Sequence, residues 1–126
     1  MIRKCLLACV VSIPLLSNAA LADELIAKGK TVYDTVGGCT ACHGPVGAGD
    51  GPAAVALNPR PQNLAAGSFK FDTDKDGATG TEADLFNVIS NGAAQYSGSP
   101  SMVGRADISE DDRKALVKYV LSLSGK

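Results

Sequence analysis

Cys39, Cys42 and His43 are the residues of this chain whose types and spacing most directly suggest chemistry. They form the pattern C-x-x-C-H, which is the attachment motif for c-type haem. Each thiol can add across a haem vinyl group to form a thioether, and the histidine that follows can then bind the iron. The motif predicts one covalently bound haem c, with Cys39 and Cys42 as attachment residues and His43 as an axial ligand.

Other uses of this motif fit the sequence less well. A structural zinc site needs four ligands, but His43 is the single histidine, and the two remaining cysteines, Cys5 and Cys9, lie in an N-terminal segment that we expect to be removed. A thioredoxin-like redox pair needs a βαβ setting, and the sequence has no such pattern. A disulfide between Cys39 and Cys42 would close a strained four-residue loop and leave His43 unexplained.

Met102 is the candidate for the sixth iron ligand. The chain has no second histidine, and the other methionine is Met1. Met102 lies in the Gly/Pro/Ser-rich loop 98–104, outside any apolar periodicity, so a gap-filling role in a core is a poor explanation for it. The alternative is an open or water-bound sixth site, which would permit small-ligand binding or peroxidase-like chemistry.

The N-terminus has the features of a secretory signal peptide. Basic Arg3 and Lys4 precede a short apolar stretch, residues 5–16, and Ala20-Leu21-Ala22 provides a small-x-small cleavage site. We therefore predict that residues 1–22 are cleaved and that residues 23–126 form one monohaem domain. Leu6-Leu7-Ala8-Cys9 weakly resembles a lipoprotein box, so a lipid anchor at Cys9 is the alternative.

Composition excludes several other classes. The whole chain has 126 residues with 12 basic and 13 acidic side chains, which gives no basic excess for binding nucleic acid. No run of about 18 apolar residues is present, so we expect no membrane span. Without residues 1–22 the balance becomes 10 basic to 13 acidic side chains, a weak indication of a partner with a basic patch.

Helices separated by Gly/Pro-rich loops are expected to hold the motif. The apolar spacing predicts a first helix over residues 23–36, in which Gly29 suggests a close helix approach. Further helices are predicted over residues 82–91, with Thr81 as N-cap, and after Ser109. The segment 44–67 is interpreted as a belt around the haem edge, with a short helical turn over residues 53–57. The expected fold class is all-α, with three to four helices around one haem.

The ordered set of motifs resembles the class I c-type cytochromes, which are small soluble monohaem electron carriers. Gly29 and Tyr33 have the Gly-x-x-x-aromatic arrangement of the N-terminal helix. The C-x-x-C-H motif, the loop with Met102 and a last helix carrying Tyr119-Val120-Leu121 follow in the family's order. The resemblance implies a cytochrome c-like fold in which Gly29 faces the helix bearing Tyr119. It also implies His43 as proximal ligand and Met102 as distal ligand.

Two parts of the haem surroundings are less determined. Members of this family orient the proximal imidazole through a backbone carbonyl, often of a proline, and Pro52 in the Gly51-Pro52 step and Pro61 are the candidates here. Some members hold a haem propionate with a tryptophan, which this chain lacks. The candidates to replace it are Arg60, Gln62, Asn63 and a tyrosine such as Tyr96.

An acidic segment, residues 72–77, begins like an EF-hand loop with the pattern D-x-D-x-D-G. That loop needs a bidentate glutamate at its twelfth position, where this chain has Ala83. We therefore expect a solvated acidic turn at Asp72, Asp74 and Asp76. Weak calcium binding, or docking of a basic partner, is the alternative.

These observations together predict a one-electron carrier, not an enzyme. Haem attachment to C-x-x-C-H follows export in bacteria, so we expect a monomeric periplasmic protein that docks briefly with a redox donor and a redox acceptor. The alternative function is a haem enzyme or sensor with an open sixth site. The two differ in whether Met102 stays on the iron.

Overall fold

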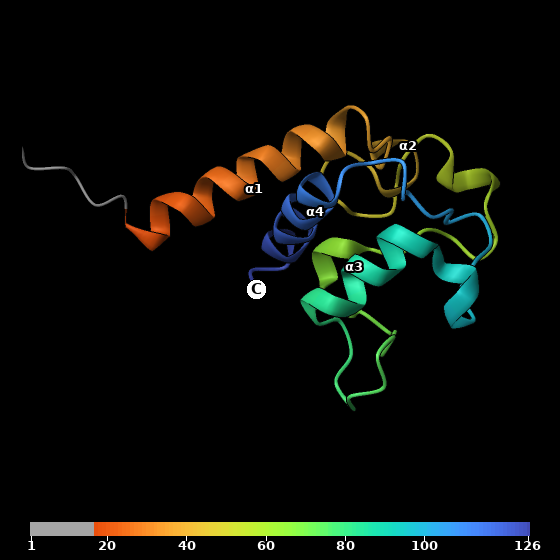
Figure 1. The fold of residues 1–126 in the computed structure, drawn as a ribbon. Coiled ribbons are helices and arrows are strands. Elements are labelled where there is room, and N and C mark those ends of the chain that lie inside the picture. Colours follow the sequence, from red (N-terminus) through yellow and green to blue (C-terminus); the bar gives the residue numbers. More distant parts are fainter. Residues whose placement is uncertain (1–16) are drawn as a thin grey trace, which may run out of the picture.

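The computed structural model describes residues 17–126 and is all-helical over that range. Its α-helices are α1 (Asn18–Asp34), α2 (Thr40–His43), α3 (Glu82–Asn91) and α4 (Glu110–Leu123), and its short 3-10 helices are η1 (Ala54–Ala56), η2 (Leu64–Ala66) and η3 (Ala93–Tyr96). The described range has no strand, only an isolated bridge between Gly92 and Val103. The predicted all-α class is therefore confirmed, and Figure 1 shows the arrangement.

The core is built on the crossing of α1 and α4, which lie side by side (Figure 1). Gly29 is buried at this crossing, and a Cβ atom added there would lie 2.0 Å from the carbonyl oxygen of Ala115 and 2.8 Å from the Cβ of Tyr119. Only a residue without a side chain allows this approach. Next to it the rings of Tyr33 and Tyr119 pack edge to face, with centroids 5.2 Å apart. The predicted contact of Gly29 with the helix bearing Tyr119 is confirmed.

The first helix is displaced toward the N-terminus from its predicted range. It begins at Asn18, not Asp23, because Ala19 to Ala22 are strong helix formers. Its first turns are exposed and project beyond α4 (Figure 1). It ends at Asp34, so Val36, expected on the buried stripe, is 62% exposed.

The predicted signal peptide lies mostly outside the described residues, which begin at residue 17. The predicted cleavage position after Ala22 falls within α1, so cleavage stays a prediction. Within residues 17–126, we find no helix with the length and apolar character needed to cross a membrane.

Both later helices begin where local capping signals predicted. The Thr81 hydroxyl accepts from the amide of Asp84, and the Asp84 carboxylate accepts from the amide of Thr81, which makes a reciprocal capping box at the start of α3. Ser109 caps α4 by accepting from the amide of Asp112. Gly92, with φ of 85°, ends α3. These bounds match the prediction because caps are short-range interactions.

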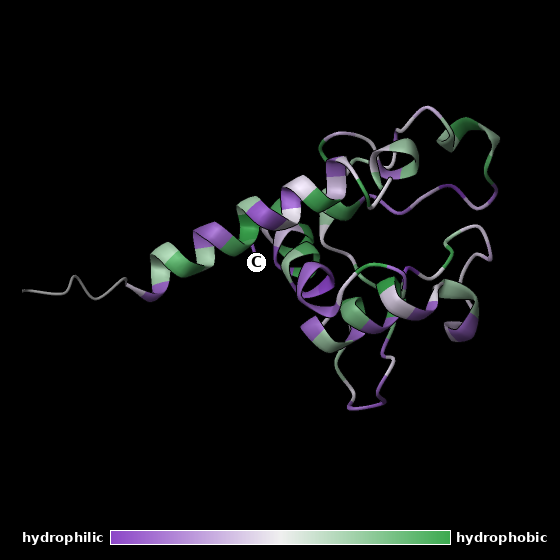
Figure 2. Ribbon diagram, turned by 45° about the horizontal axis from the view of Figure 1, so that its top comes forward, coloured by the Kyte–Doolittle hydropathy of each residue, from purple (hydrophilic) through white to green (hydrophobic). Residues whose placement is uncertain are grey.

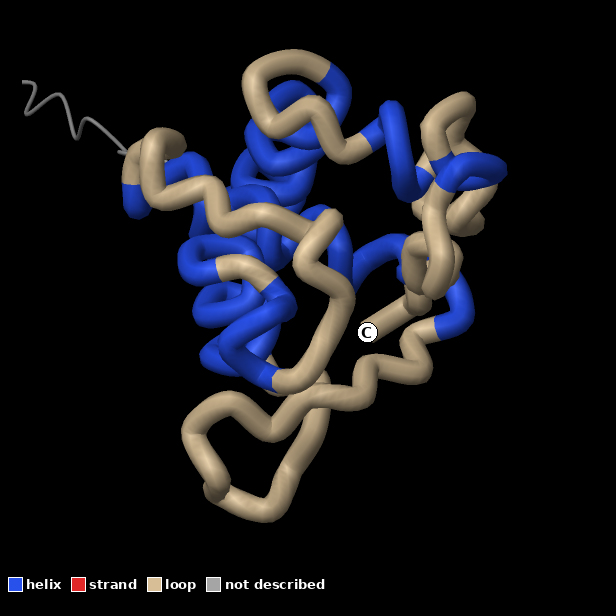
Figure 3. Tube along the Cα trace, turned by 90° about the vertical axis from the view of Figure 1, so that its right-hand side faces the viewer, coloured by secondary structure: helices blue, strands red, loops and turns tan. Residues whose placement is uncertain are grey.

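Long loops cover one side of the helices, as the tan segments in Figure 3 show. The segment 72–77 forms a loop that extends away from the helices (Figure 1) and is mostly hydrophilic (Figure 2). It is closed by its own carboxylates, since Asp72 accepts from the amides of Asp76 and Gly77 at 3.1 and 3.0 Å. Oxygen atoms of Asp72, Asp74 and Asp84 lie within 4.8 Å of one another, and calcium binding at this turn stays a prediction.

Candidate haem site

The C-x-x-C-H motif forms a single helical turn. The amides of Cys42 and His43 both donate to the carbonyl of Cys39, at 3.2 and 2.8 Å. Residues three and four apart on a helix lie on the same side, so this turn places Cys42 and His43 on the side of Cys39. Cys39 and Cys42 are free, partly buried thiols. Burial raises the pKa of the Cys39 thiol.

The belt segment holds this turn through the backbone. The C-terminal carbonyls of a helix need partners outside the helix, and here Gly49, Gly51 and Ala53 donate their amides to His43, Cys42 and Ala41 at 2.8, 3.1 and 2.9 Å. A Cβ at residue 51 would lie 2.4 Å from the Ala41 carbonyl oxygen. The glycines of the belt thus allow the chain to pass directly against the motif.

The imidazole of His43 is oriented by a backbone carbonyl, as expected, but by that of Gln62. The distance from Nδ1 of His43 to the Gln62 oxygen is 3.0 Å. The two predicted acceptors, Pro52 and Pro61, are both wrong. The Gly51-Pro52 step instead uses its Gly51 amide to cap α2, and the acceptor follows Pro61 by one residue.

This hydrogen bond fixes which nitrogen of His43 is available. A carbonyl can only accept, so Nδ1 carries the proton and Nε2 keeps its lone pair. Burial lowers the pKa of His43, and the hydrogen bond to Gln62 partly opposes that effect. The lowered pKa favours the neutral ring, which is the form that binds a metal.

A cavity of about 760 Å³ lies beside His43, within the range of cofactor pockets. His43, Cys42 and Met102 all contribute to its walls, although Met102 is distant from the other two in sequence. Most of the remaining lining is apolar and comes from the belt, from the segment between η2 and α3, from α3, and from η3 with the loop that follows it. These apolar residues include Leu57, Pro59, Pro61, Phe69, Phe71, Leu85, Val88, Ala93 and Pro100. An apolar cavity with a thiol, an imidazole and a thioether on its walls fits a haem c.

Other predicted site residues differ in their relation to this cavity. Arg60 and Asn63 line it, and the Asn63 side chain also caps η2 by accepting from the amide of Ala66 at 3.1 Å. Cys39, Pro52 and Tyr96 are not among its lining residues. The Tyr96 hydroxyl accepts from the Asn91 side chain at 2.9 Å.

The loop that carries Met102 is joined to the end of α3. The amide of Ala93 donates to the Met102 carbonyl at 3.0 Å, and Gly92 forms the isolated bridge with Val103. The close approach needs small residues, because a Cβ at residue 92 would lie 2.8 Å from the amide nitrogen of Gly104. Met102 is thus placed by backbone contacts at its own residue.

Two buried groups near the site were not predicted as part of it. The Tyr33 hydroxyl donates to the carbonyl of Gly44, the residue after His43, at 2.6 Å, and burial raises the pKa of Tyr33 above its usual range. Asp84 is 1% exposed and lines the cavity. Burial alone would raise the pKa of Asp84, but hydrogen bonds from Thr73 and Thr81 outweigh it and lower the pKa to about 2. A tyrosine in an apolar stripe signals the first contact, since its hydroxyl needs a partner.

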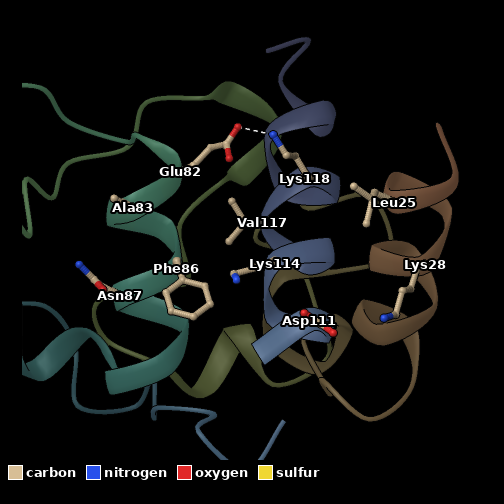
Figure 4. A pocket seen from close by; sticks show the side chains of 10 residues that line it. All are labelled: Leu25, Lys28, Glu82, Ala83, Phe86, Asn87, Asp111, Lys114, Val117 and Lys118. Atoms are coloured by element: carbon tan, nitrogen blue, oxygen red, sulfur yellow. Dashed lines mark hydrogen bonds and ion pairs between the residues drawn. The ribbon is translucent and has the colours of Figure 1, made fainter. Parts of the chain in front are cut away.

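A second cavity, of about 600 Å³, lies between α1, α3 and α4 (Figure 4). Leu25, Phe86 and Val117 form its apolar part, and charged side chains surround them. One pair, Lys118 and Glu82, joins α4 to α3 across it. None of its lining residues is a cysteine, histidine or methionine, so its chemistry does not suit an iron-bound cofactor.

Comparisons with known proteins agree with this site. The family model for cytochrome c matches residues 26–124. Four chains of solved structures match, among them one from the Kuenenia stuttgartiensis reducing HAO-like protein complex Kustc0457/Kustc0458. It is 28% identical, with a TM-score of 0.64 over 96% of this chain and 51% of that chain. This chain therefore spans about half the length of that protein.

The search of curated proteins finds no significant relative. The family model, in contrast, covers most of the chain and includes the C-x-x-C-H turn, Gly29, Met102 and the whole of α4. The helical fold and the cavity walls are consistent with it. The chain belongs to the cytochrome c family.

Proposed function

We propose that this chain is a periplasmic one-electron carrier whose single haem c is attached to Cys39 and Cys42 and ligated by His43 and Met102. The observation that carries the proposal is the shared cavity, whose walls include both His43 and Met102. Held there by these residues, a haem would supply one-electron redox chemistry at its iron. A methionine ligand raises the reduction potential.

The protein's own residues would bind, orient and shield the group. The Gln62 carbonyl accepts from Nδ1 of His43 and so holds the ring, which leaves Nε2 on the opposite side of the ring as the nitrogen available to the iron. The same hydrogen bond raises the basicity of the ligand. Apolar side chains such as Phe69 and Leu85 line the cavity and exclude water from it. None of these roles requires a general acid, a base or a nucleophile.

Polar groups at the cavity would meet the charged edge of the cofactor. Arg60 is exposed and lines the cavity, so we assign its guanidinium to a propionate. The Asn63 side chain uses its oxygen to cap η2, which leaves its amide nitrogen free to donate. Both contacts are part of the proposal.

The spectrum of the haem-loaded protein tests the ligation. We expect low-spin c-type bands in both oxidation states and a weak long-wavelength methionine-to-iron band in the ferric form. Met102→Ala should abolish that band and allow carbon monoxide to bind the ferrous form. The neighbouring Val103→Ala is the matched control, because the Val103 side chain is 63% exposed and its backbone bridge is retained.

A reversible, one-electron redox titration in the wild type would support the carrier. High-spin bands, or ready binding of carbon monoxide or peroxide by the wild type, would instead mean an open sixth site. Peroxidase and gas-binding assays would then replace the search for redox partners.

Export is tested on the mature protein. Mass spectrometry of the haem-loaded protein from a periplasmic fraction should give the mass of a chain that starts at Asp23 and carries one covalently bound haem. A species that starts at Cys9 and carries lipid would indicate a lipid-anchored protein.

A further inference from the structure

We propose that Arg105 is a positioning residue that couples the Met102 loop to the segment leading into Cys39, and so keeps the Met102 thioether in place. The inference rests on the proposed His43/Met102 ligation. It concerns a contact between parts of the chain that are far apart in sequence and that carry the two opposite sides of the site.

The Arg105 side chain reaches the turn between α1 and α2. Its Nη1 donates to the carbonyl of Gly37 at 2.5 Å, and its Nη2 donates to the carbonyl of Val36 at 2.8 Å. Gly37 is buried and lies two residues before Cys39. The guanidinium therefore binds the backbone where the chain enters the haem-attachment turn.

The Arg105 backbone is bound to a different element. Its amide donates to the carbonyl of Ile89, in the last turn of α3, at 2.7 Å. Three residues earlier the carbonyl of Met102 accepts from Ala93. One residue thus connects the end of α3 and the Met102 loop, through its backbone, to the attachment segment, through its side chain.

Asp107 orients the guanidinium for this contact. Its two carboxylate oxygens accept from Nε and Nη2 of Arg105 at 2.8 and 2.9 Å, in a bidentate pair. With the two carbonyls, this arrangement uses the planar set of donors that arginine has and lysine lacks. A lysine could satisfy one of these acceptors, not all of them.

A coupling of this kind matters for the sixth ligand in particular. His43 belongs to the same turn as both attachment cysteines, whereas Met102 reaches the cavity from a loop without helical structure. Its thioether is a weak, neutral ligand that an added base can replace. The occupancy of the iron by Met102 should therefore follow the stability of the loop that Arg105 holds.

Imidazole binding to the ferric, haem-loaded protein measures this directly, because imidazole must displace Met102. We expect Arg105→Gln to bind imidazole about tenfold more tightly than the wild type. That factor corresponds to about 1.4 kcal/mol, the size of one hydrogen bond from a charged donor. Arg105→Lys should lie between the two, and covalent haem content should be unchanged.

Arg113→Gln is the matched control. Arg113 donates to the Ser90 hydroxyl, and its guanidinium lies 4.9 Å from the centroid of the Phe86 ring, so neither of these contacts is with the attachment segment. Its loss should lower thermal stability without changing imidazole affinity. If Arg105→Gln also lowers only thermal stability, Arg105 is a purely structural residue and the proposal is overturned.

Two further measurements keep the test decisive. If Arg105→Gln does not fold, Asp107→Asn leaves the guanidinium in place but removes its orienting partner, and a two- to threefold tighter imidazole affinity is expected. An unchanged affinity would overturn the proposal.

If the wild type lacks the methionine band, the proposed ligation has failed. Hydrogen exchange at the Ala93 amide, about tenfold faster in an Arg105 variant, then still tests the coupling.

Discussion

Replacement of Gly29 by alanine tests the helix crossing on which the domain is built. In an exposed helix the change from glycine to alanine stabilises by about 1 kcal/mol. At this crossing the added Cβ would lie 2.0 Å from the Ala115 oxygen, whereas ordinary contacts begin at 3.4 Å. The obstacle is backbone, so α1 and α4 must separate by roughly 1 Å, a distance that well-packed interiors do not absorb freely.

The expected net effect is a loss of about 2–3 kcal/mol in the free energy of unfolding. Overpacking costs about 1–3 kcal/mol, and separation of the helices also loosens the edge-to-face contact of Tyr33 with Tyr119. For a domain of this size the melting temperature should fall by roughly 10–20 °C. Thermal unfolding of the haem-loaded protein, followed by far-UV circular dichroism, measures this fall.

Ala27→Gly provides the control in the same helix, since Ala27 is exposed. It should cost about 1 kcal/mol, the ordinary preference for alanine. Glycine would then be favoured at position 29 and disfavoured at position 27. A Gly29→Ala variant that melts at or above the wild-type temperature would refute the packing argument, because the helix preference alone would then decide the outcome.

Two further substitutions test buried polar contacts at the site. Asp84→Asn should cost about 2 kcal/mol near pH 7, as the folded-state pKa of Asp84 is about 2. A carboxylate with a depressed pKa stabilises above its unfolded pKa of about 4, so the difference between the two proteins in urea denaturation should disappear as the pH falls toward 2. A pH-independent difference would contradict this. Tyr33→Phe should cost about 1 kcal/mol by removing the buried hydrogen bond from the hydroxyl to the Gly44 carbonyl, which then keeps the amide of Gly47 as its donor. An unchanged urea midpoint would count against the hydroxyl bond.

The parts of the fold that the sequence predicted well depend on short-range interactions. Thr81 and Ser109 begin α3 and α4 because their hydroxyls accept amides a few residues on. The C-x-x-C-H turn is equally local, and a glycine within an apolar helical stripe signals a close approach before any partner is known. The start of α1 was predicted less well. The first helix was expected to begin at Asp23, but the alanine-rich residues 19–22 also favour helix, so α1 already includes them.

The errors concern long-range backbone contacts. Every residue offers the same backbone carbonyl, so the acceptor for His43 depends on the path of the belt. The sequence indicated the neighbourhood of Pro61 but not the Gln62 oxygen itself. The same reason hides the contact of Arg105 with Gly37, 68 positions away. An arginine in a loop carries no pattern that distinguishes a surface charge from a bridge between segments.

The bridge between Gly92 and Val103 joins the two ends of the loop that leads to Met102. A segment joined at its base can change in length and composition at little entropic cost, and Met102 is held at that base, because its carbonyl accepts from the amide of Ala93. Residues 97–101 nevertheless line the cavity. Under the proposed ligation, mutation in this short segment can therefore vary how much solvent reaches the site while Met102 stays in place, which would make the loop a region where relatives diverge in redox properties without rebuilding the fold.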